Sequence, residues 1–437
     1  MDGLFLVLEP ANHMYKVIEA AHRRGLTVVV CHGQPVSPPA PFDRALSSIS
    51  QFLPIESWGD GDAAFAAIRA CCGDRPVRGT YAGYEITLRM EARLRQHHGL
   101  PGPSPAKLDF LLDKVAVRAA LRESSLSNLR VLDDAALRRL TAWPFPGRAA
   151  FLKPVNGAGS LYVRRCTSLV DVGEHLAEWD GKRRHVRQAA SDHLYGGRGL
   201  CLEEEAVGEL LSVEGYCHRG RYVPIGITDR TVLARDPSVE MGTTFPYPHP
   251  RRDEILERSR AIHACLGIEH GPTHAELIVP PSGGDIELVE LNVRFGGGDI
   301  LFVVNHALDL RFEEDLVTLA VGEGPLTALS SRPVRYVSGQ DLLAPAHVRC
   351  FDSIEIPGDD VFFKKVLVKP GTELKSTNFQ TDQVAAYAVA ADTYLEALAR
   401  GSAVRAAVTI NGERLGDDPN NVVIHYGERG SPEASGG

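Results

Sequence analysis

Two short runs near the middle of the chain, residues 273–277 and 290–294, carry carboxylate, amide and imidazole side chains that could hold a metal ion. Apolar residues alternate through both runs, as they do in half-buried strands. The segment between them, residues 280–285, is rich in proline and glycine, so the two runs are predicted to form a β-hairpin. With the turn centred near Gly283, Glu276 would lie opposite Glu290.

The period of two along a strand places five polar side chains on one face of this hairpin. They are His274, Glu276, Glu290, Asn292 and Arg294. Crowding carboxylate and amide acceptors onto one face is costly unless a cation lies there. Hard oxygen ligands suit Mg²⁺, which usually takes one or two protein carboxylates together with substrate phosphates. The competing interpretation is an ordinary solvated face of an antiparallel sheet.

Two lysines and a glycine-rich loop lie upstream of the hairpin. Lys153 ends an apolar strand and directly precedes the loop of residues 154–160, and Lys114 lies about forty residues earlier. A lysine in this place can hold a phosphate while the amides of the loop donate hydrogen bonds to its oxygens. A tight hairpin turn that needs glycine explains the same loop equally well.

Three successive carboxylates end another apolar strand, in residues 201–208. Such neighbours repel each other unless a partner is present. The amine of an adenine base needs an acceptor, and the backbone of a hinge in this place could read the edge of the base. A solvated acidic turn is the alternative.

Arg294 is followed by three glycines that lead into a predicted helix. The arginine could neutralise charge on a transferred phosphoryl group, and the start of the helix is a favourable place for an anion. Alternatively, Arg294 simply pairs with Glu290 or Glu276.

Length and composition restrict the class of protein. A chain of 437 residues is expected to form two to four domains, and 44% hydrophobic with 24% charged residues is ordinary for a soluble protein. The net charge of −9 argues against nucleic acid as a partner. No apolar run approaches the roughly 20 residues of a membrane span, and the N-terminus does not resemble a signal peptide. Eight cysteines without a CxxC pair favour a reducing cytoplasm.

The elements that must position these residues alternate along the chain. Residues 4–31 read as strand, helix and strand, which predicts a parallel βαβ unit, and the absence of a GxGxxG run there gives no support for a dinucleotide site. A breaker-rich segment at 99–105 marks a boundary. Residues 106–123 are predicted to be helical, and residues 150–153 and 161–165 to be strands of a glycine-rich hairpin. The basic stretch 183–198 is predicted to be a loop or lid. The predicted units are 1–105, 106–199, 200–328 and a β-rich 329–426, followed by a flexible tail at 427–437.

Taken in order, these features resemble the ATP-grasp superfamily of carboxylate–amine ligases across roughly residues 1–425. Within it, the chain looks most like the bacterial L-amino acid ligases that make dipeptides. The matching elements are Asp113-Lys114 with Arg118, Phe151-Leu-Lys153-Pro154 with Gly157-x-Gly159-Ser160, Glu203-Glu204 with Gly208, Thr273-His274-x-Glu276, and Glu290-x-Asn292-x-Arg294-x-Gly296-Gly297. The resemblance implies an α/β (α+β) ATP-grasp fold with an N-terminal Rossmann-like βαβ domain and a β-rich C-terminal subdomain.

The resemblance also implies a role for each of these positions, with ATP and Mg²⁺ as cofactors and Mn²⁺ as an alternative ion. Phosphates and adenine would be held by Lys114, Lys153, Gly157, Gly159, Ser160, Glu203, Glu204, Glu205, Ala206 and Val207. Two metal ions would be held by Glu276, Glu290 and Asn292, and the substrate and phosphorylated intermediate by Arg294, His274, Glu85, Gly296 and Gly297. One position departs from the family pattern: Leu210 stands where a ribose-binding glutamate is common, which leaves Glu209 and Glu214 as candidates for that task.

The implied activity joins a small-molecule carboxylate, an amino acid in this branch, to an amine through an acyl phosphate. A bicarbonate-using or purine-pathway ATP-grasp enzyme is the alternative with the same fold, and an ATP-binding regulatory protein is the alternative without catalysis. The expected partners are small molecules, with no nucleic acid and no membrane, and a homodimer is an open alternative for the assembly.

Overall fold

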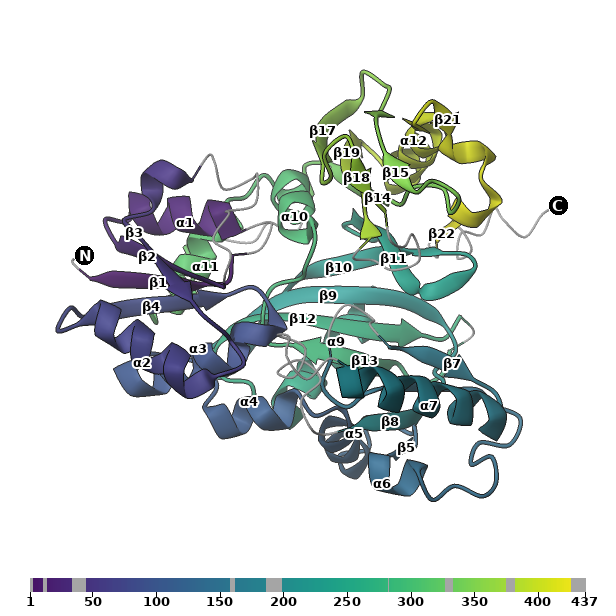
Figure 1. Ribbon diagram of the computed structural model, residues 1–437, viewed down its shortest axis with the longest axis horizontal. Helices are drawn as coiled ribbons and strands as arrows, with labels where there is room; N and C mark the ends of the chain where they lie inside the picture. The colour runs from purple at the N-terminus through teal and green to yellow at the C-terminus, as the bar shows by residue number, and fades with distance from the viewer. Residues whose placement is uncertain are drawn as a thin grey trace.

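The computed structural model describes residues 3–10, 14–33, 45–157, 162–185, 199–281, 283–326, 333–374 and 382–425. These residues form an N-terminal parallel sheet, a small four-stranded sheet and a nine-stranded sheet with helices packed against them (Figure 1). Within the described ranges, no helix combines the length and the apolar character needed to cross a membrane.

The N-terminal domain is a parallel sheet of order β3-β2-β1-β4, which confirms the predicted βαβ unit. Its strands are β1 (Leu4–Leu8), β2 (Thr27–Gly33), β3 (Gln51–Ile55) and β4 (Val77–Ala82), and its helices are α1 (Met14–Arg23), α2 (Gly61–Cys72) and α3 (Glu85–His98). The sequence did not indicate β3, because Pro54 interrupts its apolar run. A proline is tolerated there because β3 is an edge strand.

The helix predicted over residues 106–123 is in fact two helices, α4 (Pro105–Leu111) and α5 (Lys114–Glu123). The break occurs because the Asp113 carboxylate accepts hydrogen bonds from the amides of Val115 and Ala116, both at 3.0 Å, and so starts a new helix. This cap places Lys114 at the first position of α5.

The small sheet has the order β5-β8-β6-β7 and carries two helices. Its elements are β5 (Val131–Leu132), α6 (Asp134–Leu137), β6 (Ala150–Pro154), β7 (Arg164–Cys166), α7 (Leu169–His185) and β8 (Leu200–Glu204). The glycine-rich hairpin is confirmed as β6 and β7, although the second strand begins at Arg164. Because β8 pairs with β6, this sheet extends past the boundary predicted between 199 and 200. Of the predicted lid, residues 183–185 end α7 and residues 186–198 lie outside the described ranges.

The large sheet runs β13-β12-β9-β10-β11-β14-β19-β17, with β22 also paired to β10. Its strands are β9 (Glu209–His218), β10 (Arg221–Leu233), β11 (Asp236–Phe245), β12 (Gly271–Val279), β13 (Glu287–Asn292), β14 (Tyr336–Leu342), β17 (Val361–Val366), β19 (Ala385–Ala391) and β22 (Val423–His425). The last four follow residue 329, so the β-rich C-terminal region extends the same sheet as the predicted metal hairpin.

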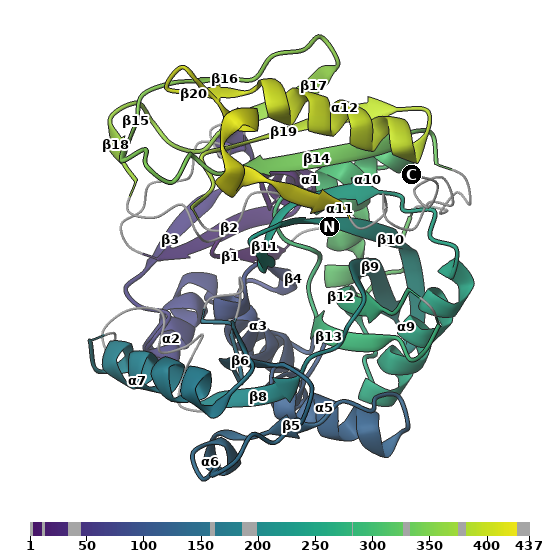
Figure 2. The ribbon, with the colours of Figure 1, turned by 90° about the vertical axis from the view of Figure 1, so that its right-hand side faces the viewer.

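Helices cover both faces of the large sheet. Side chains of α9 (Arg252–Leu266) and α12 (Tyr394–Ala407) pack into one apolar cluster, and those of α10 (Ile300–Leu308) and α11 (Phe312–Ala320) pack into another with β1 and α1. Figure 2 shows α12 lying across β14 and β19. Short strands complete the C-terminal region: β15 (Cys350–Phe351), β16 (Ile354–Glu355), β18 (Thr372–Glu373), β20 (Thr409–Ile410) and β21 (Glu413–Arg414).

A buried arginine ties α5 to both the small and the large sheet. Arg118 donates to Glu203 of β8 at 2.7 Å and to Glu287 of β13 at 3.1 Å, and it also donates to the carbonyl oxygen of Leu288. Its side chain is 3% exposed. Removing one partner of a buried ion pair leaves the other charge uncompensated. Arg118 therefore fixes the arrangement of three elements.

We expect Arg118→Leu to lower the free energy of unfolding by about 3–5 kcal/mol, because it leaves two buried carboxylates without their shared cation. Arg122→Leu, one turn later on α5 at an exposed position, serves as the matched control and should change it by less than about 1 kcal/mol. Chemical denaturation followed by circular dichroism measures both. Equal stabilities of the two variants would contradict the role of Arg118.

Candidate active site

The predicted hairpin is present in the predicted register. Strands β12 and β13 are antiparallel, with His274 opposite Asn292 and Glu276 opposite Glu290. His274 and Asn292 are 3% and 4% exposed, and the side chains of Glu276 and Glu290 are 19% and 27% exposed. The alternative of an ordinary solvated sheet face is therefore wrong. The face is a mostly buried polar surface.

His274 lies between two carboxylates. Its Nδ1 is 2.8 Å from Oε1 of Glu214, and its Nε2 is 3.1 Å from Oε1 of Glu276. Burial alone would lower the pKa of His274, but the two carboxylates outweigh it and raise the pKa to about 9. Near neutral pH the ring is therefore an imidazolium that donates from both nitrogens, and it lowers the pKa of Glu276 against the effect of burial.

The glycines after Arg294 pass directly over this pair. A Cβ atom on Gly296 would lie 3.0 Å from both Oε2 of Glu214 and Nδ1 of His274. Only glycine fits at this distance without displacing the ion pair. Gly297 has more room, since a Cβ there would lie 3.8 Å from Nη1 of Arg294.

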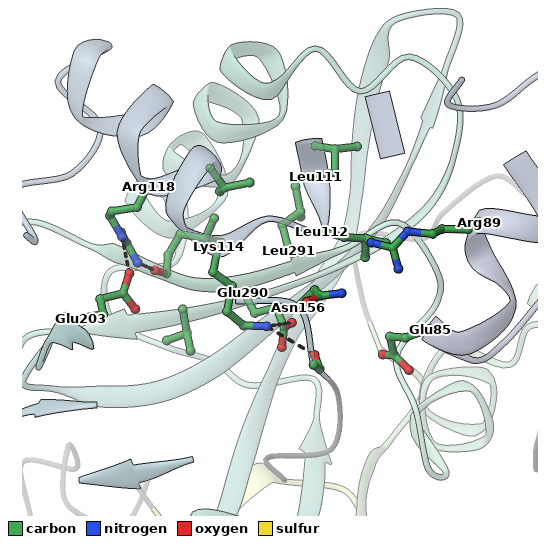
Figure 3. Close-up of a pocket in the computed structure, with 14 residues that line it drawn as sticks. Glu85, Arg89, Leu111, Leu112, Lys114, Arg118, Asn156, Glu203, Glu290 and Leu291 are labelled. Carbon is green, nitrogen blue, oxygen red and sulfur yellow. Dashed lines mark hydrogen bonds and ion pairs between the residues drawn. The ribbon is translucent and has the colours of Figure 1, made fainter. Parts of the chain in front are cut away.

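Lys114 contacts the hairpin from the start of α5. Its Nζ lies 2.9 Å from Oε1 of Glu290 and donates to the carbonyl oxygen of Gly157 at 3.3 Å (Figure 3). Burial lowers the pKa of Lys114, but Glu290 outweighs this effect and the pKa is raised. A lysine ammonium thus occupies the kind of position that a metal ion would take against Glu290.

The three successive carboxylates of the predicted hinge each have a cationic partner. Glu203 lies between Lys153 and Arg118, Glu204 between Arg130 and Arg148, and Glu205 beside Arg165. The alternative of a solvated acidic turn is therefore wrong for Glu203 and Glu204, which are 5% exposed. Burial raises the pKa of Glu203, but Lys153 and Arg118 outweigh it and the pKa is lowered.

These ion pairs change what the predicted hinge could offer to a base. The carboxylate of Glu203 is occupied by Lys153 and Arg118, so backbone groups of residues 205–207 are better placed than this side chain to read an adenine edge. Val207 is 75% exposed. Gly208 follows it with no space for a side chain, because a Cβ there would overlap the carbonyl of Val279.

Arg294 pairs with neither of the partners considered from the sequence, Glu290 and Glu276. Its Nε donates to Oε1 of Glu85 at 2.8 Å, and Nη2 contacts the same oxygen. Burial lowers the pKa of Arg294, but Glu85 outweighs it and the pKa is raised. The pair joins the start of α3 in the N-terminal domain to the segment directly after β13.

A recess of about 580 Å³, part of it open to solvent, brings several of these groups together (Figure 3). Five residues predicted for the site line it: Glu85, Lys114, Gly157, Glu203 and Glu290. They come from α3, α5, the loop after β6, β8 and β13. The structure therefore gathers side chains that lie far apart in the sequence.

Some predicted residues are not placed in this way. Gly159 and Ser160 lie outside the described ranges. Neither candidate for ribose is positioned for it: Glu214 is fully buried against His274, and Glu209 contacts His249 on the opposite side of β9. The Glu214–His274 pair was not predicted from the sequence. The alternation of Ser212, Glu214 and Tyr216 along the sequence places Glu214 on one face of a strand. The sequence does not indicate that this strand, β9, pairs with β12.

The donor set is suited to Mg²⁺ only when phosphates complete it. Among the described residues, no three His, Cys, Asp or Glu side chains form a group that could hold a metal ion. Glu276, Glu290 and Asn292 supply two carboxylates and one amide from paired strands. This number matches the protein share of a magnesium site shared with a nucleotide.

The raised pKa of His274 makes stability depend on pH. In the unfolded chain a histidine titrates near pH 6.5. The stabilisation from the Glu214 and Glu276 pairs is therefore fully present below about pH 6.5 and is lost as the pH rises through about 9. We expect His274→Gln to remove about 3 kcal/mol at pH 6 and much less at pH 10. Denaturant unfolding of both proteins from pH 6 to 10 measures this. A difference that stays constant over the range would contradict it.

Comparisons with known proteins identify the family of the chain. Residues 18–102 match the family described as "ATP-grasp N-terminal domain" and residues 148–301 the family described as "ATP-grasp domain". The chain is 24% identical over 318 residues to the alanine–anticapsin ligase of Bacillus subtilis (strain 168), an alignment that covers 67% of this chain and 66% of the relative. It is 26% identical over 329 residues to protein y4rH of Sinorhizobium fredii, covering 70% of this chain and 63% of that protein. The matches thus span slightly less than two thirds of these relatives.

Solved structures share the whole fold. The L-amino acid ligase from Bacillus licheniformis superposes with a TM-score of 0.80 at 18% identity, covering 93% of this chain and 98% of that one. Phosphoribosylglycinamide synthetase from Anaerococcus prevotii gives 0.67 at 14% identity, covering 94% and 99%. The two family matches and the shared fold agree with each other. The chain belongs to the ATP-grasp superfamily.

Proposed function

We propose that this protein is an ATP-dependent ligase that joins a carboxylate of the amino-acid class to an amine through an acyl phosphate. The observation that carries the proposal is the convergence of Lys114, Glu290 and Glu276 with the Arg294–Glu85 pair on one buried face. The similarity to an alanine–anticapsin ligase and to an L-amino acid ligase supports the amino-acid substrate class.

The nucleotide would lie between the small sheet, which carries Lys153, and the large sheet, which carries the hairpin of β12 and β13. Lys114 and Lys153 supply the positive charge for its phosphates, and the backbone after Glu204 supplies hydrogen-bonding groups for the base. Mg²⁺ held by Glu276, Glu290 and Asn292 would neutralise phosphate charge and align the phosphates for transfer. Mn²⁺ accepts the same ligands and is expected to substitute.

The acceptor carboxylate would lie near Arg294. The guanidinium stabilises the negative oxygens of the substrate and of the acyl phosphate. Glu85 accepts a hydrogen bond from the ammonium of an amino acid. The imidazolium of His274 holds Glu276 in place and contributes a fixed positive charge. Little covalent help is needed, because phosphoryl transfer depends mainly on positioning and electrostatics.

The reaction has two steps, phosphoryl transfer to the carboxylate and then amide formation. A carboxylate oxygen of the substrate attacks the γ-phosphorus, the bond from that phosphorus to the β-phosphate oxygen breaks, and ADP leaves. The nitrogen of the second substrate then attacks the acyl carbon, loses a proton and displaces inorganic phosphate. The products are an amide, ADP and phosphate.

A bicarbonate-using or purine-pathway reaction is the second candidate, because enzymes of both kinds share the fold with TM-scores of 0.67–0.68. The higher score of the L-amino acid ligase favours the amide-forming reaction. A cytoplasmic location and a homodimer are predictions of the same proposal.

Phosphate release separates these functions. We expect release with ATP and Mg²⁺ only when an amino acid and an amine are both supplied, and mass spectrometry should show the amide. Amino acids are tested singly and in pairs, with bicarbonate and phosphoribosylamine as further substrates. Release with bicarbonate alone would favour the second candidate. No release with any combination would favour a non-catalytic ATP-binding protein.

Glu290→Gln should lower turnover by about 100-fold or more, since it removes a charge that binds both the metal and Lys114. The fold should persist, because a glutamine side chain has the shape of the glutamate that it replaces and the position is partly exposed. Glu257→Gln, at an exposed position of α9, is the matched control. Near-normal turnover of the Glu290 variant would overturn the metal assignment.

A further inference from the structure

We propose that Arg230 and Thr228 form an oxyanion subsite that contacts the transferred phosphoryl group from strand β10. This inference rests on the proposed function and adds two residues of β10 to the predicted site. Both residues belong to β10, outside the hairpin of β12 and β13.

The register of the large sheet places the two side chains on the catalytic face. Thr228 lies opposite Ser212 of β9, and Ser212 lies opposite Glu276 of β12. Side chains on one strand alternate between faces, so Arg230, two residues after Thr228, shares this face. The intervening Asp229 points the other way, where it accepts from Tyr394 of α12 at 2.6 Å.

Glu240 holds two nitrogens of the Arg230 guanidinium, and the third nitrogen has no hydrogen-bond partner in the described residues. Nε donates to Oε1 of Glu240 at 3.0 Å, and Nη2 contacts the other oxygen of the same carboxylate. Nη1 has no hydrogen-bond acceptor within the described part of the chain, although Arg230 is only 4% exposed. The hydroxyl of Thr228, at 0% exposure, is also without a partner there.

Two buried donors on adjacent positions of one face indicate an acceptor that the protein itself does not supply. A buried guanidinium N–H without an acceptor is costly, because it loses its hydrogen bonds to water. A structural ion pair with Glu240 alone accounts for Nε and Nη2, but not for Nη1. A ligand oxyanion would satisfy Nη1 and the Thr228 hydroxyl together.

The acidic groups around Arg230 favour a phosphoryl group as the ligand of this subsite. The carboxylate with the largest electrostatic effect on Arg230 is Glu276, followed by Glu214. Glu276 is one of the residues that would hold Mg²⁺ with the nucleotide, so the anion expected on this part of the face is a phosphoryl group. Arg230 is only 4% exposed, so its charge is screened little by water and acts strongly on a bound anion. A fixed cation in such a place stabilises charge that develops during transfer.

Equilibrium binding tests the subsite independently of turnover. The affinities for ADP and for a non-hydrolysable β,γ-imido ATP analogue are measured by calorimetry with Mg²⁺, for wild type, Thr228→Val, Arg230→Lys and the double variant Arg230→Met/Glu240→Gln. The double variant avoids leaving Glu240 as an unpaired buried charge, and Thr228→Val keeps the side-chain shape. Arg221→Met, at the exposed start of the same strand, is the matched control.

We expect the affinity for ADP to stay within about twofold in every variant, while the affinity for the analogue falls about 10-fold in the double variant and less in Thr228→Val. Phosphate release should fall about 100-fold in the double variant and stay unchanged in Arg221→Met. Arg230→Lys should keep part of the affinity for the analogue, because it keeps the charge without the fixed geometry.

Three results would overturn the subsite: equal losses for ADP and the analogue, near-normal phosphate release in the double variant, or an effect confined to the KM of the amine substrate. The last result would assign the two donors to a substrate carboxylate instead. Failure of the proposed function is distinguishable, because wild type would then release no phosphate, while the comparison of ADP with the analogue could still be made.

Discussion

The arrangement of this protein depends on the neutralisation of buried carboxylates by cations from other segments. Glu276 and Glu214 share the imidazolium of His274, Glu290 has Lys114, and Glu85 has Arg294. A carboxylate left alone in such places would cost several kcal/mol, so each pair fixes the distance between two segments. The N-terminal domain, α5 and the large sheet are joined in this way around one face.

The same pairs suit the highly charged substrate of the proposed reaction. Each cation that a phosphate or carboxylate would need is already present and already balanced by an acid. If Mg²⁺ binds Glu290, Lys114 loses its partner and becomes available to a phosphate. In the proposed reaction, a substrate carboxylate at Arg294 would replace Glu85, and Glu85 would then face the ammonium of the substrate. Binding would therefore exchange partners among charges that are already paired, so that no single cation or carboxylate is left alone on a buried surface.

The sequence predicted features whose causes are local and missed those that depend on distant pairing. The register of Glu276 with Glu290 followed from the turn residues and the alternation of apolar side chains, and the structure confirms it. The partner of Arg294 could not be found in this way, because Glu85 lies 209 positions away on a different domain. The position of Arg230 likewise depends on the pairing of β10 with β9, and β9 with β12. A single sequence carries no local signal for such pairing. The N-terminal βαβ unit was predicted. Strand β3 was not predicted, because Pro54 interrupts its apolar run. The extension of the large sheet by β14, β19 and β17 was not predicted either.

The small sheet and the large sheet carry different groups of the proposed site. The predicted metal ligands, His274 and Arg230 all lie on the large sheet, whose strands are hydrogen-bonded to one another and covered on both faces by helices. Lys153 and the glycine loop belong to the small sheet, which follows a different strand order and is joined to the large one through residues 205–208. Groups that must align with the reacting atoms need fixed distances, and a continuous sheet provides them. Groups that hold the rest of the nucleotide tolerate more variation. The proposed chemistry is therefore placed on the most constrained part of the chain.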